Sequence, residues 1–472
     1  MRKFFGLIIN EYVKILCKVS TKIMLAVIII VALCYNALLN LGANIMMNQS
    51  YSYHEGPDEM IARAQAEQYE GWERDVEMYT YAKENNIDMV YSYPDNNSAE
   101  SWRRDAVYYM FNTKDLLKES GNNADLEKCI KDIDAAIKNK DWKAYYRASL
   151  SSLEILSSIN GEYGQTDVNA IQVWNWQYKI DNDIAPASWK NILVDEITQN
   201  KQSLLNYANV TEFDDGYGEK AEILNKLAIA EYRLEKNIEH YTYDGIESMG
   251  NIQSIGFWTI FATSSGTISI ISVLIIVVAG SLLSSEFSAG TVKFLLINPV
   301  KRWKIFAAKY ASVLSITLIA VFALYIFNLL FAGIFFGFGN LGAPFLSAEN
   351  GKIIVGSSLL YIAGKYLLGS VGMLCMATFA FAISSLVRNS ALSIGLGVFL
   401  LFSGNLAVTI LTALGFYQSK YILFANTDLN AVMNGTTGFI NHTLAFALIN
   451  IAVYMTVFIL TAWDGFVRND VK

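Results

Sequence analysis

The sequence predicts an all-α membrane protein, with six transmembrane helices and a mainly helical extracytoplasmic domain between the first two spans. Of the 472 residues, 53% are hydrophobic and 17% are charged, and the mean hydropathy is +0.30. Soluble chains carry about 25% charged residues, so this composition disfavours a plain soluble enzyme. Six apolar windows and a very uneven charge distribution support the same conclusion.

The net charge of −7 is an average over two dissimilar parts of the chain. Residues 44–254 hold 20 Lys and Arg against 37 Asp and Glu, a net charge of −17. The remainder holds 16 basic and 6 acidic residues, a net charge of +10. The acidic part would repel phosphates, which disfavours a nucleic-acid partner.

Apolar windows define the spans. A helix of about 20 apolar residues crosses a hydrocarbon core of roughly 30 Å. One window precedes the acidic segment and the others follow it. We expect spans at 23–43 and at about 256–283, 310–335, 366–386, 391–414 and 443–463. With six spans, both chain ends lie on the same side.

Basic residues orient these spans. They cluster in residues 2–22, in the loop 293–309, at Arg388, and at Arg468 and Lys472 after the last span. All these clusters face one side, and the positive-inside rule makes that side cytoplasmic. Both termini are therefore expected in the cytoplasm and the acidic segment outside. Only one cysteine lies in that segment, so no internal disulfide can form there, which suits a bacterial plasma membrane.

Residues 1–22 are predicted to form a cytoplasmic amphipathic helix at the membrane interface. One face is apolar and the other carries a lysine at every fourth position, at Lys14, Lys18 and Lys22. A cleavable signal peptide ending near Leu41-Gly42-Ala43 is the alternative. The apolar run is longer than such a peptide usually has, which favours an uncleaved span over 23–43.

Two further segments are neither clear spans nor clear loops. Residues 352–365 contain an apolar stretch bracketed by Lys352 and Lys365, which predicts an outer interfacial helix with snorkelling lysines. Residues 415–442 are partly apolar and interrupted by Asn and Gly. They are expected to form short re-entrant helices, which membranes tolerate only where protein buries them.

Apolar spacings of three and four residues predict helices in the extracytoplasmic domain. We expect them at about 58–86, 99–119, 126–137, 141–159, 189–207 and 219–240, with Ser188 capping the helix that begins near Trp189. The domain is rich in Trp and Tyr. These side chains either line a ligand surface or anchor packed helices, and the second role is the commoner one. The expected anchors are Trp72, Trp102, Trp142 and Trp189.

Motifs for chemistry are missing from the sequence. It contains no GxxxxGK[ST] phosphate loop and no HExxH or CxxC metal motif, so we expect no catalytic, cofactor-binding or metal-binding residue. Charges inside the spans are nearly absent, although ion-coupled carriers need them. Asn328, Asn405 and Asn450 lie there and are expected to form interhelical hydrogen bonds. Any transport must draw its energy from another chain.

The stretch between spans two and three is the most informative one. It has an amphipathic segment between Gly290 and Pro299 that is rich in cations and expected on the cytoplasmic face. On its own, this pattern is also typical of a surface turn that binds anionic lipid. The order of an acid, Gly-Thr, an apolar run, Pro, Arg and Lys resembles the ABC-2 type permeases, the membrane subunits of one class of ABC exporters. The matching residues are Glu286, Gly290, Thr291, Pro299, Arg302 and Lys309.

A second patch, between spans four and five, resembles the same family through Ser385, Arg388 and Asn389. The resemblance covers about 1–43 and 255–472, and it departs from many members in the large insert 44–254. It implies that residues 284–303 form a coupling loop that binds a cytoplasmic ABC ATPase. ATP and Mg²⁺ would be bound by that partner, and a second permease half, identical or related, would complete the transporter.

These features lead to an expected function. The protein is expected to be the permease subunit of an ATP-driven exporter, and its nearly uncharged spans favour an apolar or amphiphilic cargo such as a peptide, a lipid or a drug-like molecule. The alternative is a membrane-anchored binding or sensing protein whose outer domain recognises an envelope partner or peptide. An intramembrane enzyme has the weakest support, since no paired acids or nucleophile–base set appears.

Overall fold

The computed structural model divides into two compact units, which are treated separately. The membrane unit comprises residues 1–41, 255–342 and 357–472, and the insert unit comprises residues 42–254 and 343–356. The residues described are 2–17, 19–50, 56–89, 100–120, 123–159, 166–211, 214, 216–243, 246–249, 252–253, 256–288, 301–349, 351–439 and 441–468.

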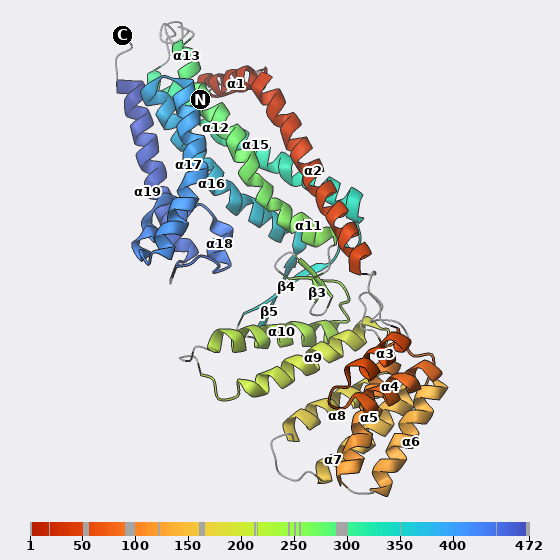
Figure 1. Cartoon of the computed structure of the whole chain (residues 1–472). Helices are drawn as coiled ribbons and strands as arrows, with labels where there is room; N and C mark the ends of the chain where they lie inside the picture. Colours follow the sequence, from red (N-terminus) through yellow and green to blue (C-terminus); the bar gives the residue numbers. More distant parts are fainter. Residues whose placement is uncertain are drawn as a thin grey trace. The chain divides into compact units, whose positions relative to one another are not determined.

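The membrane unit is helical (Figure 1). Among the described residues, six helices are long and apolar enough to cross a membrane, as the sequence predicts. A separate helix, α1 (Arg2–Cys17), precedes them. The spanning helices are α2 (Val19–Ser50), α11 with α12 (Phe257–Thr263 and Ile268–Leu282), α15 (Arg302–Phe336), α16 (Ser358–Val387), α17 (Ser390–Ala413) and α19 (Leu444–Trp463).

The second span is interrupted. A 3₁₀ turn, η2 (Ser264–Thr267), separates α11 from α12. The Ser264 hydroxyl hydrogen-bonds with the Tyr366 hydroxyl at 2.7 Å. The Asn328 amide reaches Thr267 Oγ1 at 3.4 Å. Short 3₁₀ segments inside a helix often mark hinges or functional sites.

Hydrogen bonds between helices cross the apolar interior. Asn36 Nδ2 of α2 donates to Asn328 Oδ1 of α15 at 3.1 Å, and both side chains are fully buried. The interhelical role predicted for Asn328 is therefore confirmed. Asn450 differs, because its amide donates to the Phe446 carbonyl of its own helix.

Two sequence-based boundaries are wrong. The third span begins at Arg302 instead of 310, so Lys309 lies inside α15 and not in the loop. The interfacial helix expected at 352–365 is also absent, since Lys352–Ser357 forms strand β5 and α16 begins at Ser358. The run Ile353-Ile354-Val355 explains this second error, because β-branched side chains favour strands.

The short helices expected within residues 415–442 are present among the described residues. They are η3 (Tyr417–Tyr421), η4 (Leu423–Ala425) and α18 (Leu429–Met433). Asn426 holds the loop together, since its Nδ2 donates to the carbonyls of Lys420 and Ile422, both at 2.9 Å. Its Oδ1 lies 3.0 Å from His442 Nε2.

The insert unit is mainly helical. Its helices are α3 (Pro57–Glu67), α4 (Trp72–Glu84), α5 (Trp102–Ser120), α6 (Ala124–Asn139), α7 (Trp142–Ile159), α8 (Thr166–Asp181), α9 (Trp189–Asn206) and α10 (Tyr217–Lys236). Ser188 caps α9 by accepting a hydrogen bond from the Asn191 amide, as predicted. The helix expected over 58–86 is two helices, separated where Gln68 and Gly71 adopt positive φ. Helix α8 was not predicted, because its apolar residues do not form one stripe.

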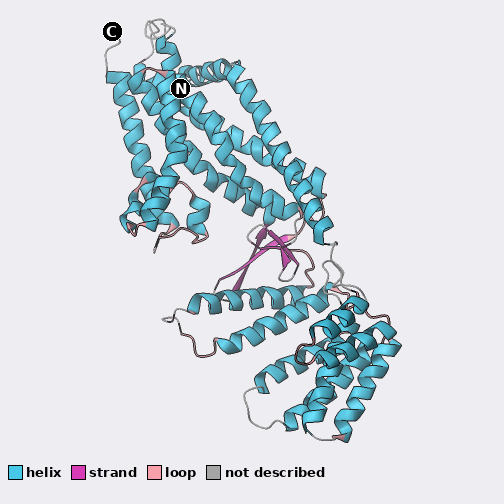
Figure 2. Ribbon diagram, in the orientation of Figure 1, coloured by secondary structure: helices cyan, strands magenta, loops and turns pink. Residues whose placement is uncertain are grey.

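A small sheet makes the all-α expectation wrong in one place (Figure 2). Among the described residues, its strands lie in the order β3-β2-β1-β4-β5. Strand β1 pairs antiparallel with β2 and parallel with β4. The strands are β1 (Thr242–Tyr243), β2 (Ile246–Met249), β3 (Ile252–Gln253), β4 (Pro344–Glu349) and β5 (Lys352–Ser357). Strands this short carry too few alternating residues to be recognised in sequence.

Aromatic side chains form much of the insert unit's core. Trp102 is buried and stacks on Tyr145, with ring centroids 5.5 Å apart. Trp142 packs against this core and Trp189 against a second cluster. The predicted role as packing anchor is confirmed for Trp102, Trp142 and Trp189, whereas half-buried Trp72 belongs to neither of these clusters. Cys129 is buried and carries no disulfide.

Candidate functional site

One end of the membrane unit gathers the polar residues that the sequence singled out. Helix α1, the short helix α13 (Ser284–Ser288) and the last turns of α19 lie at this end (Figure 1). Helix α15 also begins here, at Arg302. We call it the α13 end. The other end of the membrane unit, where α18 lies, is called the α18 end.

A buried lysine joins segments of the α13 end that are far apart in sequence. The side chain of Lys309 is 1% exposed. Its Nζ lies 2.9 Å from Glu11 Oε2 of α1 and 2.6 Å from Glu286 Oε1 of α13. A buried ammonium group is tolerated only when it is paired and hydrogen-bonded, and both conditions hold here. We call Glu11, Glu286 and Lys309 the charged triad.

The charged triad has an outer member. Lys14 lies 3.5 Å from Glu11 and is largely exposed, whereas Glu11 is buried. Lys14 and Lys309 together balance the charges of the two glutamates. Removing one member of such a buried network leaves the others uncompensated, at a typical cost of about 3–5 kcal/mol. The triad therefore ties α1, α13 and α15 into one rigid group.

A serine cluster beside the triad links α13 to the turn between α16 and α17. The Ser284 amide donates to Ser384 Oγ at 3.0 Å, and the Ser284 hydroxyl lies 2.6 Å from that of Ser390. Ser385 donates to the Ala462 carbonyl of α19 at 2.8 Å. The predicted site residue Ser385 thus holds two spans together at the α13 end.

Arg388 and Asn389 shape the turn between α16 and α17. Arg388 adopts a left-handed conformation with φ of 59°, and its guanidinium lies 4.8 Å from the centre of the Phe287 ring of α13. Asn389 caps α17 by accepting hydrogen bonds from the amides of Ala391 and Leu392. This turn and α13 are therefore in direct contact.

The structure brings some of the predicted coupling residues together. Glu286 and Lys309 form an ion pair, and Arg388 contacts the same short helix. Arg302 begins α15 and is half-buried, and no ion pair between it and Glu286 is present among the described residues. The remaining predicted residues, Gly290, Thr291 and Pro299, lie outside the described residues.

Sequence reasoning missed Glu11. The basic pattern of residues 2–22 did not single it out, yet it is the second carboxylate of the charged triad. The available signal was its position: an acid surrounded by lysines, next to the apolar face of an amphipathic helix, is a candidate partner for a basic residue elsewhere.

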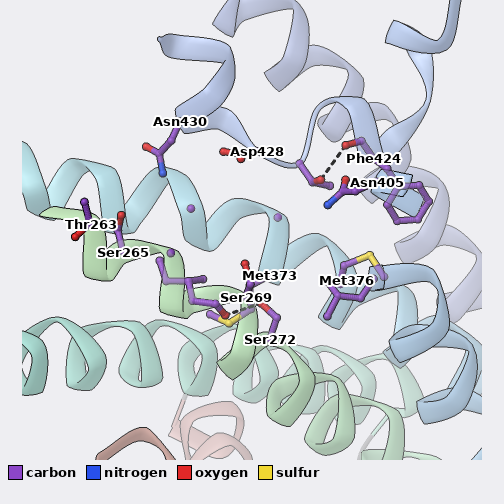
Figure 3. Close-up of a pocket in the computed structure, with 16 residues that line it drawn as sticks. Thr263, Ser265, Ser269, Ser272, Met373, Met376, Asn405, Phe424, Asp428 and Asn430 are labelled. Carbon is purple, nitrogen blue, oxygen red and sulfur yellow. Dashed lines mark hydrogen bonds between the residues drawn. The ribbon is translucent and has the colours of Figure 1, made fainter. Parts of the chain in front are cut away.

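A cavity of about 380 Å³ opens in the membrane unit, and no residue of the charged triad lines it. Figure 3 shows this cavity. Its walls come from α11, η2, α12, α16, α17 and the loop around α18. Hydroxyl groups line one part of it, and Asn405, Asp428 and Asn430 line another. In the part of the chain that the structure describes, no three His, Cys, Asp or Glu side chains group as a metal site requires.

Comparisons with known proteins identify a matching family and similar proteins. The family described as "Protein of unknown function (DUF2705)" matches residues 229–472. The chain is similar to "Uncharacterized protein YhcI" of Bacillus subtilis (strain 168), with 34% identity over 54% of this chain and 77% of that protein. It is also similar to "Uncharacterized membrane protein YdbK" of the same organism, with 31% identity over 43% of this chain and 78% of that protein.

No solved structure matches the chain significantly. The six apolar helices and the membrane-protein relative identify the chain as a multi-pass membrane protein.

Proposed function

The chain belongs to the family described as Protein of unknown function (DUF2705), and we propose that it is the permease subunit of an ATP-driven exporter of ABC-2 type. Its cargo in this proposal is apolar or amphiphilic, because the spanning helices carry almost no charge. The relatives from Bacillus subtilis support a bacterial plasma membrane as its location.

The proposed orientation follows the basic residues. The α13 end is cytoplasmic, because it carries Lys14, Lys301, Lys304 and Arg388. The insert unit, with its large negative charge, is then extracytoplasmic. A cysteine placed at exposed Lys301 would react with a membrane-impermeant maleimide only after the cells are opened, whereas one placed at exposed Gly71 would react in intact cells.

The charged triad is the observation that carries the proposal. A separate ATPase moves a permease only if a force on its loop reaches the spanning helices. Glu286 lies within the proposed coupling loop 284–303, and Lys309 belongs to the span that follows it. Glu11 connects the same lysine to α1. A push on the segment would therefore move α1, α13 and α15 together.

The proposed mechanism assigns the chemistry to the partner. The ATPase binds ATP and Mg²⁺ and contacts residues 284–303, and the permease contributes the path through the membrane. A second permease half, a further copy of this chain or a relative, forms the other wall. Two such halves rock between closed and open arrangements when the ATPase subunits close and open.

Co-purification with candidate ATPases tests this proposal. We expect the chain to form a complex with one of them and to raise its rate of ATP hydrolysis. Changing Gly290, Pro299 and Arg302 together is expected to abolish both effects. A matched control, Lys352→Ala on exposed strand β5, is expected to change neither. An intact complex and intact stimulation in the triple variant would refute the coupling role.

A further inference from the structure

The cavity of the membrane unit is built around the interruption of the second span. Ser265 and Gly266 of η2 line it, followed by Ser269 and Ser272 of α12. The interruption places Ser265 and Gly266 on the cavity wall, and the serines of the regular helix α12 add further hydroxyl groups. Its volume of about 380 Å³ lies within the range of about 300–1,000 Å³ typical of small-molecule sites.

A glycine lets the α18 loop form the opposite wall. A Cβ atom on Gly372 of α16 would lie 2.7 Å from the Thr427 carbonyl oxygen, closer than real contacts allow. Glycine at this position therefore permits the loop to lie against α16, and the approach brings Thr427 and Asp428 to the cavity. Figure 3 shows Asp428, Asn430, Asn405 and Phe424 on the loop side of the cavity.

The hydroxyl groups of the cavity present acceptors. Each hydroxyl has one hydrogen, and four of them are already donated to backbone carbonyls. Thr263 donates to Thr259, Ser265 to Ala262, Ser272 to Ile268 and Thr427 to Phe424, at 2.8–3.1 Å. The lone pairs of these oxygens remain, so the wall accepts hydrogen bonds from a guest.

Asn430 and Asp428 add stronger acceptors. Asn430 Nδ2 donates to the Lys365 carbonyl at 3.0 Å, and its Oδ1 is buried without a hydrogen-bond partner among the described residues. Asp428 Oδ1 accepts from the Ala431 amide at 3.1 Å. Of the sixteen lining residues, Asp428 alone has an ionisable side chain, and no Lys or Arg of the described chain pairs with it.

The remaining wall is apolar and adaptable. Met373 and Met376 of α16 and Phe424 of η4 line it, together with Leu401 of α17. Flexible methionines adapt to guests of varied shape, and methionine and phenylalanine both contact apolar chains well. The cavity therefore combines one negative charge and several acceptors with an apolar wall.

We propose that this cavity binds the protonated primary amine of an amphiphile, with Asp428 as its counter-charge, Asn430 Oδ1 and the serine hydroxyls as acceptors, and the methionine wall around its apolar chain. A primary ammonium has three N–H donors and no acceptor, which complements the acceptors in the cavity. This inference deepens the proposed function. The statement that the bound amphiphile is the transported cargo rests on the exporter proposal.

Binding to the full chain in phosphatidylcholine nanodiscs tests the inference without any ATPase. The probes share an eight-carbon chain: octylamine, octyltrimethylammonium, octanol and octyl sulfate. Calorimetric titrations are corrected by those on protein-free nanodiscs. We expect octylamine to bind about ten-fold or more tightly than octanol, and the trimethylated probe to bind more weakly because it cannot donate. Equal binding of octylamine and octyl sulfate would overturn the inference.

Variants locate the site. Asp428→Asn removes the charge and keeps the cap of α18, since Asn and Asp cap helices equally well. We expect it to weaken octylamine binding about ten-fold and to leave octanol binding unchanged. Asn430→Leu is expected to weaken octylamine binding independently, so the test survives if one variant misfolds. Asp464→Asn at the α13 end, also an exposed acid, is the matched control and is expected to bind octylamine normally.

The outcomes separate this inference from the proposed function. Selective octylamine binding in a chain that stimulates no ATPase would refute the exporter proposal, and the inference of an amine-binding site would still stand. Stimulated ATP hydrolysis in a chain whose octylamine affinity is unchanged by Asp428→Asn and Asn430→Leu would refute the site and leave the exporter proposal.

Discussion

The two ends of the membrane unit differ in whether their polar side chains are paired with one another. At the α13 end, the buried ammonium of Lys309 contacts two carboxylates and is closed off from solvent. At the α18 end, the Asp428 carboxylate and the Asn430 carbonyl oxygen border an open cavity. Polar groups that satisfy one another hold structure together, whereas unsatisfied acceptors beside a cavity provide binding capacity.

This difference assigns separate tasks to the two ends. The α13 end has the character of a rigid joint, because removing any partner of the triad is costly. The α18 end has the character of a recognition site, because a guest can supply the missing donors. Substitutions at the two ends are therefore expected to affect different properties, and the effects below run from the largest to the smallest.

Lys309→Met has the largest expected effect. It removes the buried cation that Glu11 and Glu286 share, at a cost of about 3–5 kcal/mol in unfolding free energy. Thermal unfolding in detergent measures the loss. Adding Glu11→Gln and Glu286→Gln to the same variant is expected to restore much of the stability, because neutral groups need no cation.

The matched control is Lys301→Met, at the exposed residue before α15. It is expected to shift the unfolding midpoint little. If Lys309→Met shifted the unfolding midpoint as little as this control does, the charged triad would not stabilise the α13 end. The proposed difference between the two ends would then be wrong.

Gly372→Ala has an intermediate expected effect at the α18 end. The new methyl group meets the Thr427 carbonyl at 2.7 Å, and such overpacking typically costs about 1–3 kcal/mol. Displacing Thr427 also moves Asp428, so we expect octylamine affinity to fall as well. Gly395→Ala on α17 meets nothing within 4 Å and is the control, expected to be neutral or slightly stabilising.

Acidification has the smallest expected effect. Burial and, second, the charge of Lys420 lower the pKa of His442 from its ordinary 6.5. In the unfolded chain this histidine binds a proton more readily, so stability contributed by the α18 loop is lost as the pH falls through about 6.5 toward the lowered value. The protection factors of residues 415–439, which are the intrinsic exchange rates at each pH divided by the observed rates, are expected to fall on acidification, and more than those of residues 284–288.

The control for this effect is His442→Gln, which cannot titrate and keeps a side chain that hydrogen-bonds. Its protection factors in residues 415–439, corrected for the intrinsic exchange rate at each pH, are expected to be the same on both sides of pH 6.5. A pH dependence that persists unchanged in this variant would mean that another group is responsible.

The sequence predicted most of the helices, because long apolar windows and three-four spacing reflect burial directly. It could not predict the sheet, since strands of two to six residues from distant segments carry little local signal. At the candidate site, the resemblance identified Glu286 and Lys309, which pair across 23 positions, but the part of Glu11 depends on a contact across 298 positions. Lys309 was placed in the loop because hydropathy windows exclude a charge that tertiary pairing allows inside a helix.

The exporter proposal is tested most directly by crosslinking from both ends of the membrane unit. A photoreactive amino acid replaces Trp303, exposed at the α13 end, or Tyr417, exposed in the loop that contains α18. The chain is co-expressed with the ATPase that co-purifies with it. We predict that position 303 crosslinks to the ATPase and position 417 does not. Crosslinks from position 417, or none from position 303 in a complex that still hydrolyses ATP, would contradict the proposal.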